Sequence, residues 1–172
     1  MLLAELTGSA LPADRYNGLA SCGITAALRE IWPVMSSTRV LVVDDYEPFR
    51  RYICATLGRS LDYWIVGEVS DGLQAVHEAE ALQPDVILLD IGLPGLDGLE
   101  AARRIRKLSP DAKILFVSQE SSTEVIEAAL NSGAFGYVVK AHAACELLAA
   151  VETVCGGGKY VSNGNDYRTT QR

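Results

Sequence analysis

Long hydrophobic runs, paired cysteines and an excess of basic residues are all missing from this sequence. No apolar stretch approaches the roughly 18 residues that a membrane helix needs, and no basic residue precedes Arg15, as a secretory signal would require. We therefore expect no membrane span, no export and a cytoplasmic location. The formal net charge of −7 also argues against a nucleic-acid interface on this chain alone, because such interfaces cluster lysine and arginine.

The cysteines are scattered, without a C-x-x-C pair and without a histidine at zinc-ligand spacing. They are Cys22, Cys54, Cys145 and Cys155. Reduced thiols are the simplest interpretation, and they fit a cytoplasmic protein better than a disulfide framework or a zinc site would. The glycine-rich loops that bind dinucleotides or the phosphates of nucleoside triphosphates are missing as well.

What the sequence does contain is a regular alternation of strand and helix patterns after residue 38. The expected strands lie at about 39–44, 63–69, 85–89, 113–117 and 136–139, and the expected helices at about 46–58, 72–82, 98–108, 121–133 and 143–155. Parallel strands are joined by right-handed helical crossovers, which place helices on both faces of the sheet. The fold class is therefore α/β, with a doubly wound five-stranded parallel sheet. A capping-box pattern from Ser121 to Glu124 predicts the start of the fourth helix.

The two ends of the chain differ from this middle region. Residues 1–37 contain several glycines and prolines and predict a mostly irregular N-terminal extension, with one short amphipathic helix near 24–32. Met35 stands just before the first strand, and we hypothesise that translation naturally starts there. Residues 38–155 form the predicted domain, and residues 156–172 begin with three glycines and predict a flexible C-terminal tail.

Four of the predicted strands end on polar residues. Asp44 and Asp45 follow the first strand, and Asp90 follows the third. Ser118 follows the fourth strand and Lys140 the fifth. The carboxyl ends of parallel strands lie at the same edge of a sheet, where ligands bind in this fold class. Each residue taken alone could be a helix cap or a solvated strand end, but four such ends in register with the strands favour one common site.

The residue types at this edge suit phosphoryl transfer. Carboxylate oxygens are preferred Mg²⁺ ligands, so Asp44 and Asp45 are candidate metal ligands. Asp90, at the end of the central strand, is the candidate nucleophile, because an aspartate can form an acyl phosphate. Lys140 and Ser118 would pair with the phosphoryl oxygens and help to neutralise or orient them.

Four segments of this sequence resemble the response-regulator receiver domains of two-component signalling systems. They are VVDD at 42–45, PDVILLD at 84–90, LPGLDG at 93–98 and GYVVK at 136–140, and the resemblance covers residues 38–155. It implies a flavodoxin-like sheet with strand order 2-1-3-4-5 and a phosphorelay protein rather than an enzyme with turnover on free substrates. Many receivers have a cis proline after the lysine, whereas Ala141 follows Lys140 here, so we expect a trans bond.

The resemblance also implies roles for individual residues. Asp90 would accept a phosphoryl group from a sensor histidine kinase or a phosphotransfer protein. The implied metal ligands are Asp44, Asp45, Asp90 and the backbone carbonyl of Gly92. The implied phosphate-binding and switch residues are Ser118, Tyr137 and Lys140. The switch would reshape the surface formed by the fourth helix, fifth strand and fifth helix, which would signal to a downstream output protein; a homodimer is a further option.

Two other functions remain open at this point. A phosphatase of the haloacid dehalogenase type has a related fold but needs a second aspartate two residues after the nucleophile, where this chain has Gly92. The segment GGKYVS at 157–162 resembles the end of the receiver half of LuxR-type regulators, in which a helix-turn-helix domain follows. Ten residues follow Ser162 in this sequence. The expectation is therefore a lone receiver or a truncated LuxR-type transcriptional regulator that has lost its DNA-binding domain.

Overall fold

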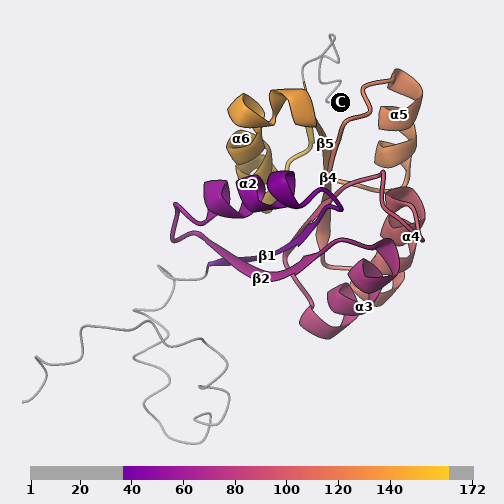
Figure 1. Ribbon diagram of the computed structural model, residues 1–172, viewed down its shortest axis with the longest axis horizontal. Coiled ribbons are helices and arrows are strands. Elements are labelled where there is room, and N and C mark those ends of the chain that lie inside the picture. The colour runs from indigo at the N-terminus through magenta and orange to yellow at the C-terminus, as the bar shows by residue number, and fades with distance from the viewer. Residues whose placement is uncertain (1–36, 163–172) are drawn as a thin grey trace, which may run out of the picture. The chain divides into compact units, whose positions relative to one another are not determined.

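The structure of the chain is a computed structural model that describes residues 37–162, in which strands and helices alternate (Figure 1). The strands are β1 (Thr38–Val43), β2 (Tyr63–Val69), β3 (Val86–Leu89), β4 (Lys113–Ser118), β5 (Gly136–Val139) and β6 (Tyr160–Val161). The helices are α2 (Glu47–Leu57), α3 (Gly72–Leu82), α4 (Gly98–Leu108), α5 (Thr123–Asn131) and α6 (Ala143–Cys155), with a short 3₁₀ helix η3 (Lys140–His142). The expected helix near 24–32, Met35 and the end of the C-terminal tail lie outside the described residues.

The strands form one parallel sheet in the order β2-β1-β3-β4-β5-β6. The α/β class and the parallel sheet are confirmed, and the order is broadly that of flavodoxin-like folds. The predicted number of five strands is wrong, because β6 adds a sixth strand beside β5. The bounds that we assigned to the domain and its extensions stay predictions.

The sixth strand lies within the segment that was expected to be a tail. It pairs Tyr160 with Gly136 and Val161 with Tyr137. A Cβ atom on Gly136 would lie 2.5 Å from the Tyr160 carbonyl oxygen, so the glycine permits the close approach of the two backbones. A strand of two residues after three glycines has no periodicity of its own, which is why no sequence pattern indicates it.

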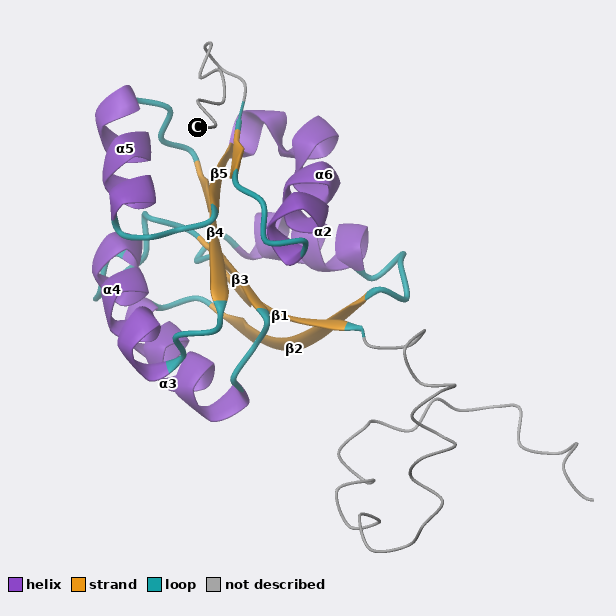
Figure 2. Ribbon diagram, turned by 180° about the vertical axis from the view of Figure 1, so that it is seen from behind, coloured by secondary structure: helices purple, strands orange, loops and turns teal. Residues whose placement is uncertain are grey.

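Helices cover both faces of the sheet, with α2 and α6 on one face and α3, α4 and α5 on the other (Figure 2). Along β1, Val40 and Val42 join the core beneath α2 and α6, whereas Leu41 and Val43 join the core on the opposite face. Strands that are buried on both faces are apolar throughout rather than alternating. The polar residues that end these strands therefore mark the edge of the sheet.

The starts of two helices show where a side-chain cap forms and where it does not. Asp71 caps α3 and accepts hydrogen bonds from the backbone N–H groups of Leu73 and Gln74 at 2.8 and 3.0 Å. The capping box predicted for the fourth helix is wrong, because Ser122 is the N-cap of α5 and makes no capping side-chain bond. Since α5 begins at Thr123, Glu124 stands at its second position and not at the third, where a capping box needs it.

Three further expectations can be checked on residues 37–162. No helix there is long and apolar enough to cross a membrane. Cys54, Cys145 and Cys155 are free thiols, as expected, while Cys22 lies outside the described range. The described backbone has no cis peptide bond, so Ala141 follows Lys140 through a trans bond, also as expected.

Candidate functional site

The four polar strand ends meet at one edge of the sheet. β1, β3, β4 and β5 are successive neighbours, and all of them are parallel, so their carboxyl ends lie together. A cleft of about 430 Å³ opens at this edge and is lined by Asp45, Tyr46, Asp90, Ile91, Gly92, Ser118, Gln119, Glu120 and Lys140. Of the predicted site residues, Asp44 and Tyr137 do not line the cleft but contact residues that do.

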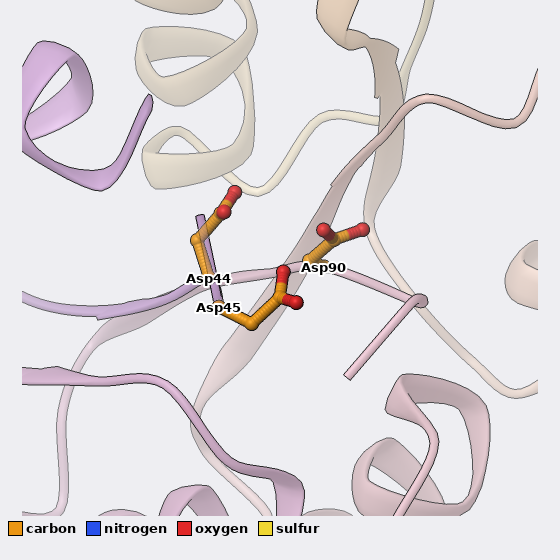
Figure 3. Close-up of side chains that lie close together, drawn as sticks. All are labelled: Asp44, Asp45 and Asp90. Atoms are coloured by element: carbon orange, nitrogen blue, oxygen red, sulfur yellow. The ribbon is translucent and has the colours of Figure 1, made fainter. Parts of the chain in front are cut away.

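Three carboxylates form the acidic part of the site (Figure 3). Asp44 and Asp45 follow β1 and Asp90 follows β3, and each offers an oxygen that lies within 4.8 Å of the others. Asp44 and Asp90 are buried, at 1% and 5% exposure, whereas Asp45 is exposed. One carboxylate therefore faces solvent and two are largely removed from it.

The ammonium group of Lys140 links the two buried carboxylates. Its Nζ lies 2.6 Å from Asp90 Oδ2 and 2.7 Å from Asp44 Oδ2, and its side chain is 8% exposed. Burial by itself lowers the pKa of Lys140, but the two carboxylates outweigh this effect and raise the pKa above its ordinary value. Lys140 is therefore charged at neutral pH and compensates part of the acidic cluster.

Asp44 is held through both its backbone and its side chain. Its Oδ1 accepts a hydrogen bond from the Tyr46 N–H at 3.0 Å, and its carbonyl accepts one from Arg50 Nη1 at 2.6 Å. Its Oδ2 makes the ion pair with Lys140 but has no partner in suitable hydrogen-bond geometry within residues 37–162. Burial raises the pKa of the Asp44 carboxyl, and the contact with Lys140 offsets only part of that rise.

Asp90 is fixed by the loop that follows β3. Its Oδ1 accepts hydrogen bonds from the N–H groups of Ile91 at 2.6 Å and Gly92 at 3.3 Å. Gly98, the first residue of α4, packs directly on this loop, where an added Cβ atom would lie 2.0 Å from the Asp90 carbonyl oxygen. The glycine thus lets the helix start close to the candidate nucleophile.

The donor set of the site fits Mg²⁺. Three carboxylates and one ammonium leave the site negatively charged, and the Asp44 oxygen described above lacks a full set of partners. Hard oxygen ligands of this kind suit a small divalent cation, which also retains several waters. Asp45 and Asp90, which line the cleft, and Asp44 beside them can hold such an ion. The Gly92 carbonyl as a further ligand stays a prediction, although Gly92 does line the cleft.

Ser118 and Tyr137 lie on neighbouring strands next to the acidic cluster. Ser118 ends β4, is 2% exposed and lines the cleft. The side chain of Tyr137, on β5, points into the core, and its hydroxyl donates a hydrogen bond to the Glu120 carbonyl at 2.8 Å. Burial raises the pKa of Tyr137 to about 12, so the phenol stays protonated at neutral pH.

Some residues of the site were not predicted from the sequence. The Phe49 ring lies against the Lys140 ammonium, with 4.9 Å between Nζ and the ring centroid. Arg50 bonds the Asp44 carbonyl and pairs with Glu68 at 3.6 Å. Phe49 and Arg50 both stand in the first turn of the helix that follows the aspartate pair, and this position is the one signal that could have indicated them.

The comparisons with known proteins agree with this geometry. Residues 40–152 match the family model of the response regulator receiver domain. The chain is 34% identical over 123 residues to the transcriptional regulatory protein DegU of Brevibacillus brevis and 35% identical over 124 residues to the response regulator GacA of Pseudomonas viridiflava. These alignments cover 72% of this chain but 52% and 58% of the two relatives, so the chain spans little more than half of their length.

Solved structures of related proteins superpose on the same region. A two-component response regulator of the LuxR family from Aurantimonas sp. SI85-9A1 aligns with a TM-score of 0.71 and 31% identity, over 74% of this chain and 91% of that one. The signal receiver domain of the response regulator NarL from Mycobacterium tuberculosis aligns with a TM-score of 0.67 and 33% identity, over 70% and 98% of the two chains. This chain belongs to the response regulator receiver domain family.

Proposed function

We propose that this chain accepts a phosphoryl group on Asp90 in a reaction that depends on Mg²⁺. The observation that carries the proposal is the position of Lys140, which bridges Asp90 and Asp44 at 2.6 and 2.7 Å beside the third carboxylate, Asp45. Phosphoryl transfer needs an acceptor, bound positive charge and accurate positioning more than it needs covalent chemistry from the protein. The site supplies an acceptor carboxylate, an acid pair that can hold a metal ion and a fixed cation.

The transfer forms one bond and breaks one. A carboxylate oxygen of Asp90 bonds to phosphorus while the bond between phosphorus and the donor atom breaks, and the electron pair of that bond leaves with the donor. The donor in the cell would be a phosphohistidine of a sensor histidine kinase or a phosphotransfer protein. The product is an acyl phosphate on the chain itself, so the protein is a phosphoacceptor and not an enzyme with turnover on free metabolites.

The residues around Asp90 each have one task in this proposal. Mg²⁺, when bound, supplies positive charge that neutralises the phosphoryl oxygens. Lys140 is charged at neutral pH because its pKa is raised, and its ammonium pairs with a phosphoryl oxygen. Ser118 donates its hydroxyl to another oxygen. Burial of Lys140 and Asp44 strengthens these electrostatic interactions because little water screens them.

Ser118 and Tyr137 would convert phosphorylation into a change of surface. Glu120 follows Ser118 by two residues, and its carbonyl accepts the hydrogen bond from the Tyr137 hydroxyl. A shift of Ser118 toward a phosphoryl group therefore moves the acceptor that holds the tyrosine ring in its buried position. The surface formed by α5, β5 and α6 would change as a result and signal to a downstream output protein. Such a partnership would place the chain in the cytoplasm.

The relatives do not by themselves assign an output to this chain. DegU is named as a transcriptional regulatory protein, but this chain aligns with only about half of its length. The described residues contain no observation that favours a truncated transcriptional regulator or a phosphatase over the phosphoacceptor function. The net charge of −7 also argues against DNA binding by this chain alone. We therefore propose signalling through protein contacts.

Labelling with a small phosphodonor tests the proposal without the unknown kinase. Incubation of the full chain with acetyl phosphate and Mg²⁺, followed by peptide mapping, should place one phosphoryl group on Asp90. Asp90→Ala should abolish the label, whereas Asp111→Ala, at an exposed aspartate outside the cleft, should not change it. A label that persists in a folded Asp90→Ala variant, or a reaction that does not need a divalent cation, would contradict the proposal.

A further inference from the structure

Phe49 lies against the ammonium group of Lys140. The centroid of its ring is 4.9 Å from Lys140 Nζ. Phe49 stands in the first turn of α2, and its N–H donates to the Tyr46 carbonyl at 3.0 Å. Tyr46 directly follows the aspartates Asp44 and Asp45 in the sequence. A short stretch of backbone therefore connects the ring with two of the candidate metal ligands.

The ring completes the surroundings of the ammonium. An ammonium group has three N–H donors. Two acceptors contact it at Lys140, namely Asp90 Oδ2 at 2.6 Å and Asp44 Oδ2 at 2.7 Å. The negatively polarised face of an aromatic ring attracts a cation within about 6 Å of its centroid, and more strongly where water is excluded. With Lys140 only 8% exposed, the Phe49 ring is a favourable third neighbour.

The ring itself is held in place. Phe49 packs against the core between the sheet and the helices α2 and α6. The Tyr52 ring lies beside it at 5.7 Å between centroids, with a tilt of 33° between the ring planes. The contact with Lys140 is thus made by a side chain that other contacts orient, and not by a mobile group on the surface.

We propose that Phe49 is a positioning residue that fixes the Lys140 ammonium for phosphoryl transfer to Asp90. This inference rests on the function proposed above. Asp44 is a candidate metal ligand as well as a partner of Lys140, so the lysine must share this carboxylate with a bound cation. The Phe49 ring is neutral and is not a ligand for Mg²⁺, so a bound metal ion does not compete for its contact with Lys140. It therefore keeps the ammonium in place, and a charge that is already in place stabilises the phosphoryl oxygens without reorganisation.

The test compares two changes at Phe49 with one at a second aromatic residue. Phe49→Leu removes the aromatic face, and Phe49→Tyr keeps it. Phe135→Leu is the matched control, because Phe135 is partly buried against the same core and makes no cation–π contact with Lys140 in residues 37–162. For each full-length variant, the initial rate of Asp90 labelling by acetyl phosphate is measured at saturating Mg²⁺. This donor has no protein surface, so kinase docking cannot affect the rate.

We expect Phe49→Leu to slow labelling about three- to tenfold and Phe49→Tyr to stay within about twofold of the wild type. Phe135→Leu should lower the melting temperature without slowing the reaction. The NMR signals of the Lys140 ε protons should carry a ring-current shift that Phe49→Leu removes and Phe135→Leu leaves unchanged. If Phe49→Leu does not fold, Phe49→Met takes its place with the same expected rate.

Two results would overturn this inference and leave the proposed function intact. One is a wild-type labelling rate in the folded Phe49→Leu variant. The other is equal slowing by Phe49→Leu and Phe49→Tyr, because a lost cation–π contact cannot explain the slowing of a variant that keeps the aromatic face. A wild-type chain that takes up no label would instead overturn the proposed function itself.

Discussion

Replacement of Lys140 by methionine should destabilise the fold and make its stability depend on pH and on Mg²⁺. Methionine keeps an unbranched apolar side chain of similar length but removes the ammonium. Two carboxylates then face each other without their common cation, since Lys140 Nζ lies 2.6 Å from Asp90 and 2.7 Å from Asp44. All three side chains are at most 8% exposed, so water does little to screen the charges.

The size of the effect follows from this burial. Removal of one partner of a buried ion pair typically costs about 3–5 kcal/mol, because the remaining charge is left uncompensated. The folded chain can limit this cost by binding a proton on Asp44, whose pKa is already raised by burial. Each unit by which the solution pH exceeds that pKa adds about 1.4 kcal/mol to the free-energy cost of this protonation. At pH 7 we therefore expect Lys140→Met to lower the free energy of unfolding by about 3 kcal/mol.

The pH dependence has a definite sign. In the variant, the folded state binds a proton on Asp44 at a higher pH than the unfolded chain does. Between those two pKa values the folded state holds more protons, so its stability increases as the pH falls. The difference in the free energy of unfolding between the variant and the wild type should therefore be smaller at pH 5 than at pH 7. Saturating Mg²⁺ at pH 7 should also reduce it, because a bound divalent cation neutralises the same carboxylates.

Urea unfolding followed by far-UV circular dichroism measures these differences. The matched control is Lys107→Met, because Lys107 is exposed and makes no ion pair in the described part of the chain. The control should change the free energy of unfolding by less than about 0.5 kcal/mol. A loss in Lys140→Met below about 1 kcal/mol that is the same at both pH values would refute the reasoning, because the ammonium would then behave like a surface group.

Three further variants test the packing around the site. Gly98→Ala should destabilise the fold by about 1–3 kcal/mol in urea unfolding, because its Cβ would lie 2.0 Å from the Asp90 carbonyl, whereas Gly92→Ala, whose Cβ meets nothing within 4 Å, should have little effect. Equal effects of the two changes would contradict this. Tyr137→Phe should cost about 1 kcal/mol through its lost bond to the Glu120 carbonyl. It should also reduce the ultraviolet absorbance change near pH 12, where burial places the pKa of the phenols of both Tyr137 and Tyr63, and an unchanged titration would contradict the raised pKa of Tyr137.

The central strands could be predicted because their burial on both faces leaves a simple pattern. The apolar runs before Asp44, Asp90 and Lys140 need no information from distant parts of the chain, since each strand must be apolar wherever both sides are covered. The polar residue after each run is then a local signal as well. The meeting of these residues follows from one general rule, that parallel strands end at a common edge.

Other features could not be predicted because they depend on contacts between distant segments. The strand Tyr160–Val161 forms only where the free edge of β5 offers backbone partners, and two residues are too few for a pattern. The cap of α5 depended on where the first turn begins, which shifts Glu124 out of the position that the motif needs. The contact between Phe49 and Lys140 joins residues that are far apart in the sequence, so the position of Phe49 just after the aspartate pair places it near the site but does not specify its contact with the lysine.

The same burial explains both the stability of the site and its chemistry. Asp44 and Asp90 are kept from water, so their charges must be compensated from within the cleft, and Lys140 compensates them only in part. The pKa of the Asp44 carboxyl is raised for the same reason, because a buried and incompletely compensated carboxylate binds a proton more readily. In the proposed reaction, a bound divalent cation would remove this imbalance and leave Lys140 free to pair with the phosphoryl group on Asp90. A site with fully balanced charges would be more stable, but its affinity for a metal ion and a phosphoryl group together would be lower.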